Sequence, residues 1–235
     1  MSVVDYDNIL TQIKALPQNW HGAGPLSDRV LQSVAQYCRE MGTIENSLET
    51  GAGKSTLFFS QISLKHTVFA INIGDSLCRV RESGLFAAET VEIVEGPTQL
   101  TLPAYSFDQK IQVALIDGPH GYPFPELEYY YIYQHLDAGA LLIIDDVNIP
   151  SIKNMADFLK KDEMFQWLET VGKTAFFRRT DAPLFDPLGD GWWDQGFNRP
   201  FLTKSNRLES IKGMIPASLL NLIPDSLKLF VQKHL

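Results

Sequence analysis

Apolar residues recur every three or four positions in two stretches near the start of the chain, which is the spacing of one face of an α-helix. Pro17 ends the first stretch, and the second begins after Pro25, where Ser27 or Asp28 can cap a helix. The pattern therefore predicts an N-terminal helical cap over residues 1–42. Its apolar positions are Val4, Ile9, Leu10, Ile13 and Leu16, followed by Val30, Leu31, Val34, Ala35 and Cys38.

From residue 43 onward, short apolar runs alternate with stretches of helical spacing. This alternation is typical of a mostly parallel sheet covered by helices on both faces. A short turn at Gly172 separates the last two runs, so they should pair as an antiparallel hairpin. We predict an α/β fold, a Rossmann-like three-layer sandwich whose seven-stranded, mostly parallel sheet ends in that hairpin. The predicted strands cover about 43–49, 66–72, 90–95, 111–117, 140–147, 165–169 and 173–180, and the helices between them 54–61, 76–83, 125–136 and 152–161.

The pattern breaks after Asp181, where Pro, Gly and a tryptophan pair interrupt the apolar runs within P-L-F-D-P-L-G-D-G-W-W-D. A long connection of this kind is typical of a lid or substrate loop. An amphipathic helix is predicted between Pro216 and Leu235. We therefore divide one structural domain into a helical cap (1–42), a core (43–181) and a C-terminal substrate loop with a helical extension (182–235).

The composition favours a small-molecule partner. The formal net charge is −8, and no cluster of Lys or Arg supplies the basic face that a nucleic acid requires. No apolar run approaches the length of a membrane span, and the acidic N-terminus does not resemble a signal peptide. Cys38 and Cys78 are too few for a disulfide framework, so we expect a cytoplasmic protein. The tail helix is a candidate homodimer contact, and its polar face is not basic enough to favour a membrane.

Residues Asn46 to Leu57, N-S-L-E-T-G-A-G-K-S-T-L, have the pattern of a strand end, a glycine turn and a helix start. The first amides of a helix have no internal partner and point at whatever lies before it. Gly51 and Gly53 allow the backbone to turn sharply and to lie close to a ligand. This stretch therefore predicts a site for a nucleotide-like ligand. The loop from Trp20 to Gly24 could cover that site, or could serve only as a packing loop with a buried indole.

Two known motifs compete for this turn, and an ordinary strand-to-helix turn is the third alternative. A phosphate-binding P-loop would use Gly53-Lys54-Ser55, but its first glycine would fall at Leu48, which leaves the loop too short. The pattern E-x-G-x-G instead resembles motif I of the class I S-adenosylmethionine (SAM) methyltransferases. The resemblance implies that Glu49 faces the cationic amino-acid end of SAM, and that Gly51, Ala52 and Gly53 pass beneath it.

The same resemblance implies two further cofactor contacts, and the sequence departs from the family at both. The family usually has an acid for the ribose hydroxyls after the second strand, where this chain has Asn72, with Asp75 nearby. Relatives often carry an acid near the adenine after the third strand, where this chain has Pro97. Gly96 and Thr98 are then the expected adenine contacts.

Three acids fall at the ends of two predicted strands. Asp117 ends the fourth strand, within I-D-G-P-H-G-Y, and Asp145 and Asp146 end the fifth, within L-I-I-D-D-V. Neighbouring strands lie about 5 Å apart, so these carboxylates can converge. Converging carboxylates repel unless protons or a cation join them. A hard divalent cation, Mg²⁺ or Mn²⁺, satisfies this requirement. Alternatively, one acid is a cap or an ion-pair partner, and only Asp117 contacts SAM.

The acids resemble those of metal-dependent O-methyltransferases that act on sugars and antibiotics, in which D-G-x-H/Y is followed by D-D at the next strand. The resemblance implies that Asp117, Asp145 and Asp146 bind the metal, with Asp117 also beside SAM. His120 would be a catalytic base or substrate contact, or otherwise a structural hydrogen-bond partner in the Gly118–Gly121 turn. The substrate-contacting candidates are Tyr122, Trp192 and Trp193, with Asp190 and Asp194 for hydroxyls; the tryptophans could equally anchor their loop.

These observations predict a SAM-dependent methyltransferase that methylates a hydroxyl of a small molecule, such as a glycosyl or natural-product acceptor, with Mg²⁺. A metal-free small-molecule N- or O-methyltransferase is the first alternative. A non-catalytic SAM-fold binding protein stays open because Asn72 replaces the ribose-binding acid. A P-loop nucleotidase is the last.

Overall fold

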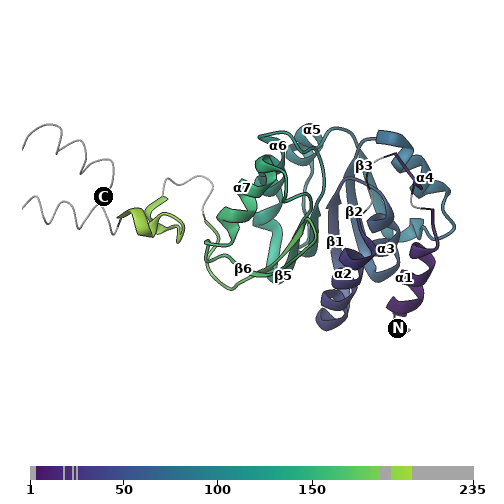
Figure 1. The fold of residues 1–235 in the computed structure, drawn as a ribbon, viewed down its shortest axis with the longest axis horizontal. Coiled ribbons are helices and arrows are strands. Elements are labelled where there is room, and N and C mark those ends of the chain that lie inside the picture. Colours follow the sequence, from purple (N-terminus) through teal and green to yellow (C-terminus); the bar gives the residue numbers. More distant parts are fainter. Residues whose placement is uncertain (1–3, 18, 23, 25, 186–191, 203–235) are drawn as a thin grey trace, which may run out of the picture. The chain divides into compact units, whose positions relative to one another are not determined.

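The structure, a computed structural model, describes residues 4–17, 19–22, 24, 26–185 and 192–202 (Figure 1). The chain divides into two compact units. The first comprises Met1–Lys160 and Met164–Leu184, and the second comprises Lys161–Glu163 and Phe185–Leu235. The helix predicted between Pro216 and Leu235 lies outside the described residues. In the parts that are described, no helix combines the length and the apolar composition needed to cross a membrane.

The first unit alternates strands and helices from residue 44 onward. Its strands are β1 (Ile44–Thr50), β2 (Ser63–Ala70), β3 (Val91–Glu95), β4 (Ile111–Ile116), β5 (Leu136–Ile144), β6 (Phe165–Val171) and β7 (Thr174–Arg179). Its helices are α1 (Tyr6–Lys14), α2 (Asp28–Met41), α3 (Lys54–Ile62), α4 (Ser76–Glu82), α5 (Thr98–Thr101), α6 (Phe124–Ile132) and α7 (Pro150–Leu159). Short 3₁₀ turns are η1 (Ile73–Asp75), η2 (Ala88–Thr90), η3 (Leu102–Ala104) and η4 (Tyr133–His135).

The seven strands form one sheet in the order β3-β2-β1-β4-β5-β7-β6. The pairs among β1 to β5 are parallel, whereas β7 runs antiparallel to both β5 and β6. This confirms the predicted α/β class and the antiparallel terminal hairpin. The strand order reverses between β1 and β4, and open α/β sheets bind ligands outside the carboxyl ends of the strands at such a reversal.

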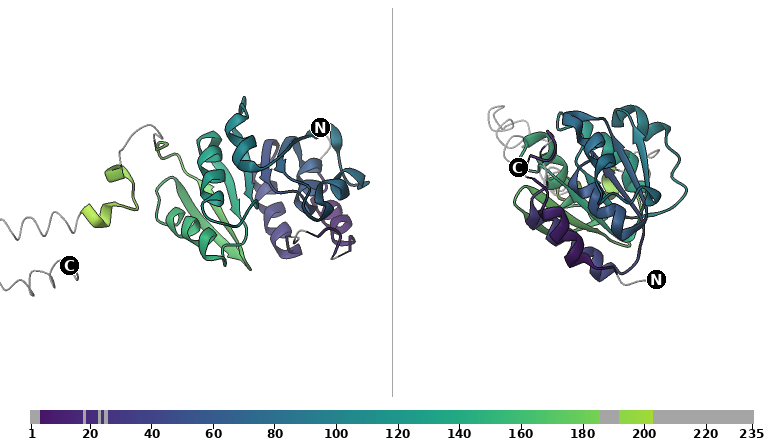
Figure 2. Two further views of the ribbon diagram at one scale, coloured as in Figure 1. Left: turned by 90° about the horizontal axis from the view of Figure 1, so that it is seen from above. Right: turned by 90° about the vertical axis from the view of Figure 1, so that its right-hand side faces the viewer.

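Helices cover both faces of the sheet (Figures 1 and 2). The chain crosses the sheet in one direction from β1 to β3 and in the opposite direction from β3 through β4 and β5 to β6. Because the crossovers between parallel strands are right-handed, α3 and α4 lie on one face and α5, α6 and α7 on the other. A core of buried side chains joins α1, α2 and α3 to their face, with Ile44 of β1, Val113 of β4, Ile143 of β5 and Phe176 of β7 among its members. The N-terminal helices are therefore packed onto the sheet.

Side-chain caps mark the starts of the two N-terminal helices. Ser27 is the N-cap of α2, and its Oγ accepts a hydrogen bond from the Val30 amide at 3.3 Å, as predicted. Asp5 caps α1 in the same way through the Asn8 amide. Among the strands, the predicted and observed first residues differ most at β5, which begins at Leu136 instead of Ala140. Gly139 has φ +84° inside this strand, and the pairing with β4 shifts register there.

The described part of the second unit is a short aromatic cluster. Trp192 begins the 3₁₀ turn η5 (Trp192–Asp194), and its ring lies 5.9 Å from that of Trp193 and 6.2 Å from that of Phe201. Asn198 Nδ2 donates to the carbonyl of Trp192 at 2.9 Å. Within the same unit, Arg199 forms an ion pair with Glu163.

Candidate cofactor and acceptor site

A cavity of about 500 Å³ opens at the carboxyl ends of β1, β2 and β4, where the strand order reverses. This volume is within the range of about 300–1,000 Å³ that is typical of small-molecule pockets. Its walls combine backbone of glycine turns, apolar side chains and a few ionisable groups. The lining residues are Gly24, Gly51, Ala52, Phe69, Ala70, Ile71, Ile73, Ser76, Gly96, Pro97, Thr98, Gln99, Asp117, Gly118, Pro119, His120, Phe124, Asp146 and Lys173.

The turn after β1 is shaped by Gly51. Its φ is +88°, in the left-handed region that favours glycine, and its amide donates to the Phe69 carbonyl at 2.9 Å. A Cβ atom at this position would lie 2.4 Å from the Asp117 carbonyl oxygen. Only glycine therefore lets the β1 turn lie against the end of β4. Gly51 and Ala52 form one wall of the cavity, as expected for a turn that carries a ligand.

Glu49 is fully buried at the end of β1. Its Oε1 accepts a hydrogen bond from Thr56 and lies 3.2 Å from His66 Nε2, while His66 Nδ1 lies 2.8 Å from Ser47 Oγ. Thr56 Oγ1 in turn accepts from the Gly53 amide at 3.0 Å. Glu49 thus anchors the start of α3 under the glycine turn. Its second oxygen, Oε2, is buried without a hydrogen-bond partner among the described residues.

Lys54, the lysine of the P-loop alternative, is buried and donates to the Leu16 carbonyl at 3.3 Å. It is not among the residues that line the cavity. A P-loop needs this ammonium at the phosphates of its ligand. The structure therefore does not place Lys54 where a P-loop lysine acts.

The loop before α2 lies across two of the glycine turns. The Gly22 amide donates to the Gly74 carbonyl at 2.8 Å, and a Cβ atom at Gly53 would lie 2.8 Å from His21 Nε2. Gly24 lines the cavity. The N-terminal segment therefore contributes to the wall of the site as well as packing against the sheet.

Asn72 lies past the end of β2, and its side chain faces α4. Asn72 Oδ1 accepts from the amides of Leu77 at 3.0 Å and Cys78 at 3.3 Å. It is not part of the cavity wall, and neither is the nearby Asp75, which has φ +59° and an exposed side chain. The wall at this point is formed by Ile71 and Ile73. Gly96 and Thr98, the expected adenine contacts, both line the cavity.

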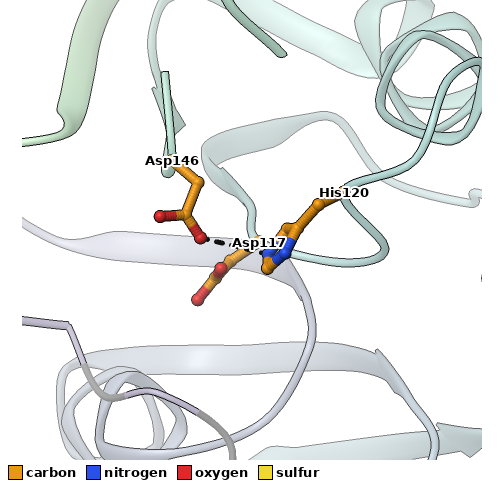
Figure 3. A group of neighbouring side chains, drawn as sticks. All are labelled: Asp117, His120 and Asp146. Atoms are coloured by element: carbon orange, nitrogen blue, oxygen red, sulfur yellow. Dashed lines mark ion pairs between the residues drawn. The ribbon is translucent and has the colours of Figure 1, made fainter. Parts of the chain in front are cut away.

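Asp117, His120 and Asp146 come together at the other side of the cavity (Figure 3). One ligand atom from each lies within 4.8 Å of the others, and His120 Nε2 lies 3.0 Å from Asp146 Oδ2. Asp117 follows β4, and Asp146 is the second residue after β5, where its φ of +56° turns it away from the strand direction. The acids of the two strand ends therefore do converge, and His120 joins them.

Asp145 has a different environment from its neighbour. It is buried, its Oδ1 accepts a hydrogen bond from Thr174, and its Oδ2 lies 3.2 Å from Lys173 Nζ. Lys173 Nζ also lies 2.6 Å from Asp146 Oδ1. The residues that converge as a candidate cation site are thus Asp117, His120 and Asp146, whereas Asp145 was expected in place of His120. The reason is that Asp145 is buried against β7, where Thr174 donates to it, whereas Asp146 lines the cavity.

The closeness of these acids affects how they hold protons. Burial raises the pKa of Asp117 well above its usual range, and the charges of Asp145, Asp146 and Glu49 raise it further. Burial lowers the pKa of Lys173, but its contacts with Asp146 and Asp145 outweigh this and raise that pKa overall. Three carboxylates face one ammonium. The raised pKa means that a proton on Asp117 relieves the repulsion in the absence of a metal ion. The two carboxyl groups and the imidazole are also donors that a divalent cation such as Mg²⁺ or Mn²⁺ takes.

Glu128 is a buried acid that the sequence analysis did not single out. It lies on α6, and Thr50 Oγ1 donates to its Oε2 at 2.8 Å, while the Asp117 amide donates to Thr50 Oγ1 at 3.0 Å. A Cβ atom at Gly118 would lie 2.0 Å from Glu128 Oε1. Burial raises the pKa of Glu128 to about 7, opposed by hydrogen bonds from Thr98, Thr50 and the Gly118 backbone. Glu128 therefore joins the ends of β1 and β4 behind the cavity.

Tyr122, the expected substrate residue of the first unit, is not among the residues that line the cavity. Tyr122 follows the turn that carries His120 and is 74% exposed. Trp192 and Trp193 belong to the second unit, so their role stays a prediction. Asp190 and the side chain of Asp194 lie outside what the structure describes.

Residues 48–147 match a family model described as a methyltransferase domain. No curated protein matches the chain. Among solved structures, a putative O-methyltransferase from Klebsiella pneumoniae is 15% identical with a TM-score of 0.57, over 77% of this chain and 92% of that one. A putative caffeoyl-CoA O-methyltransferase from Staphylococcus aureus is 16% identical with a TM-score of 0.55, over 76% and 93%. The O-methyltransferase TomG from Streptomyces achromogenes, in complex with SAM, is 15% identical with a TM-score of 0.54, over 76% and 92%.

The matched segment begins within β1 and ends just after Asp146, so it contains both the glycine turn and the acids of the cavity. The structural neighbours share the fold of the first unit, including the sheet that positions those residues. Residues 48–147 therefore form a methyltransferase domain, and the first unit has the fold of the O-methyltransferases named above, as the resemblance to the class I SAM-dependent methyltransferases implied.

Proposed function

We propose that the chain transfers a methyl group from SAM to a hydroxyl of a small-molecule acceptor. One observation carries this proposal. The glycine turn after β1 and the group of Asp117, His120 and Asp146 line the same cavity of about 500 Å³. A methyl donor and an acceptor have to meet in one water-restricted space, and a cavity shared by both sets of residues supports this.

The half of the cavity beside β1 and β2 suits SAM. Gly51 and Ala52 let the backbone lie against a ligand. Glu49 is buried beneath their turn, and neither it nor Gly53 is among the residues that line the cavity. Ile71, Pro97 and Phe124 offer apolar surface for a flat base, and Thr98 and Gln99 offer polar atoms. SAM supplies an electrophilic methyl carbon on its sulfonium.

The half beside β4 and β5 suits the acceptor. His120 is half-exposed, lines the cavity, and has its Nε2 held by Asp146. An imidazole in this position can take the proton of an acceptor hydroxyl. The contact with Asp146 fixes the orientation of the ring. Asp117 lies beside them in the cavity wall, next to the Gly51 turn.

A divalent cation is the second part of the proposal. Asp117, His120 and Asp146 would hold Mg²⁺ or Mn²⁺, and His120 would then be a ligand instead of the base. The cation itself would lower the pKa of a coordinated hydroxyl. A metal-free transfer is the alternative, and the ion pairs of Lys173 with Asp145 and Asp146 favour it. In either form the expected acceptors are hydroxylated small molecules of the glycosyl or phenol class.

Isothermal titration with SAM, S-adenosylhomocysteine and ATP tests the cofactor. We expect binding of the first two and none of ATP; binding of ATP alone would reject the proposal. Radiolabelled methyl transfer to a panel of sugars and phenols, with Mg²⁺ or with EDTA, then tests the reaction. Loss of transfer in EDTA supports the cation, and unchanged transfer supports the metal-free form.

His120→Gln tests the base. We expect kcat to fall about 10²-fold or more, with the affinity for S-adenosylhomocysteine changed less than about twofold. His135→Gln is the matched control, because His135 precedes β5 and lies at the opposite end of that strand from Asp146. Equal activity of the two variants would remove His120 from the reaction.

A further inference from the structure

Lys173 is held in place by the backbone. It lies in the turn between β6 and β7, and its carbonyl accepts a hydrogen bond from the Val147 amide at 2.9 Å. The antiparallel pairing of β5 with β7 sets Ile144 opposite Ala175, so Lys173 and Thr174 lie beside the acids that follow β5. Its side chain reaches the cavity and is 42% exposed.

The ammonium of Lys173 bridges the two adjacent acids. Its Nζ lies 2.6 Å from Asp146 Oδ1 and 3.2 Å from Asp145 Oδ2. The remaining oxygens are also engaged, since Thr174 donates to Asp145 Oδ1 and His120 Nε2 lies 3.0 Å from Asp146 Oδ2. A cation between the carboxylates of two consecutive residues at a strand end occupies a position that a bound metal ion could take. Here the protein supplies that cation itself.

We propose that Lys173 is an internal counter-cation that competes with a divalent metal ion for Asp146, and that it thereby sets the metal affinity of the site. The inference rests on the proposed function, because it concerns the same acids. A metal ion at Asp117, His120 and Asp146 would approach an ammonium that already contacts Asp146. The two positive charges repel over a few ångströms, and they share one carboxylate.

The flexible stem of Lys173 makes displacement feasible. Four methylene groups and partial exposure let the ammonium move into solvent when another cation enters, whereas Asp145 keeps its hydrogen bond from Thr174. Displacing the Lys173 ammonium separates its ion pair with Asp146, and this cost weakens the binding of the metal ion. Removing the ammonium should therefore strengthen metal binding, although it removes a contact from the site.

Titration of Mn²⁺ into the ligand-free protein tests this directly, by calorimetry or by electron paramagnetic resonance of the free ion. We expect Lys173→Met to lower the Kd for Mn²⁺ by about tenfold or more. Lys173→Arg retains the charge and should leave the Kd close to that of the wild type. Lys65→Met is the matched control for net charge, because Lys65 forms an exposed ion pair with Glu92 at the β2–β3 edge of the sheet.

An unchanged Kd in Lys173→Met, or no Mn²⁺ binding by either protein, would overturn the inference. Equal tightening by Lys65→Met would also overturn it, since the effect would then reflect net charge alone. Circular dichroism checks that each variant is folded. S-adenosylhomocysteine titrated into the same samples tests the proposed function separately: binding of this ligand with an unchanged Kd for Mn²⁺ rejects only the role of Lys173.

Discussion

Gly51 lies so close to Asp117 that a Cβ atom on the glycine would be 2.4 Å from the Asp117 carbonyl oxygen. The backbone of the glycine turn, on the proposed cofactor side of the cavity, thus contacts the backbone of Asp117 on the proposed acceptor side. A shift of one must move the other, because packed backbone segments do not deform freely. The two halves of the cavity are therefore a single structural unit.

Gly51→Ala should disturb both halves. The positive φ of +88° and the clash with the Asp117 backbone together should cost about 2–4 kcal/mol of the free energy of unfolding. We also expect weaker binding of S-adenosylhomocysteine, because Gly51 lines the cavity. Urea unfolding and calorimetric titration measure the two effects.

Gly139→Ala is the control for this substitution. Gly139 has φ +84°, but a Cβ atom there would meet no atom within 4 Å. It should cost only about 1 kcal/mol and leave ligand affinity unchanged. If the two substitutions lower the free energy of unfolding equally, the close approach of Gly51 to Asp117 does not contribute to the cost.

Glu128 predicts a pH dependence of stability. Its folded-state pKa of about 7 exceeds the ordinary value of 4.5, so the folded state holds the proton more tightly than the unfolded state. The resulting stability is present below about pH 4.5 and is lost as the pH rises through 7. A difference of about 2.5 in pKa corresponds to about 3 kcal/mol. Unfolding by urea at pH 5 and pH 8 measures it.

Glu128→Gln should remove most of that dependence, because an amide does not titrate. Glu82→Gln changes an exposed glutamate on α4 and should keep the wild-type dependence. Identical pH profiles for the wild type and Glu128→Gln would show that Glu128 is ionised throughout this range.

Asn72→Ala separates a capping role from a cofactor contact. The side chain accepts from the Leu77 and Cys78 amides, so its loss should cost about 1 kcal/mol of stability. The affinity for S-adenosylhomocysteine should change less than about twofold, since Asn72 does not line the cavity. Asn72→Asp retains an acceptor and should restore the stability. A tenfold loss of affinity in Asn72→Ala would instead indicate a ribose contact.

The fold was predictable because the buried parallel strands are nearly continuous apolar runs, as in Val113 to Ile116 of β4. The start of β5 was not predictable in the same way. Leu136 to Gly139 contains an acid and a glycine, and strand pairing there depends on a shift of register against β4. Tertiary pairing, rather than the local pattern, extends the strand.

The site was predictable to the extent that it depends on strand ends. Asp117 and Asp146 converge because parallel strands end at one edge of the sheet. The divergence of Asp145 from Asp146 depends on the positive φ of Asp146, and the place of Lys173 depends on the hairpin register. Neither leaves a signal in the local sequence. Glu128 could have been found only as an acid on the inner face of α6.

The hydrogen bond from Gly22 to Gly74 and the place of Gly24 in the cavity wall determine how this protein can be shortened. A fragment cut to the matched methyltransferase segment, 48–147, would expose the cavity on two sides, because it would lack both Gly24 and Lys173. Expression trials and chimaeras should therefore keep the chain from the first helix through β7 as one indivisible block.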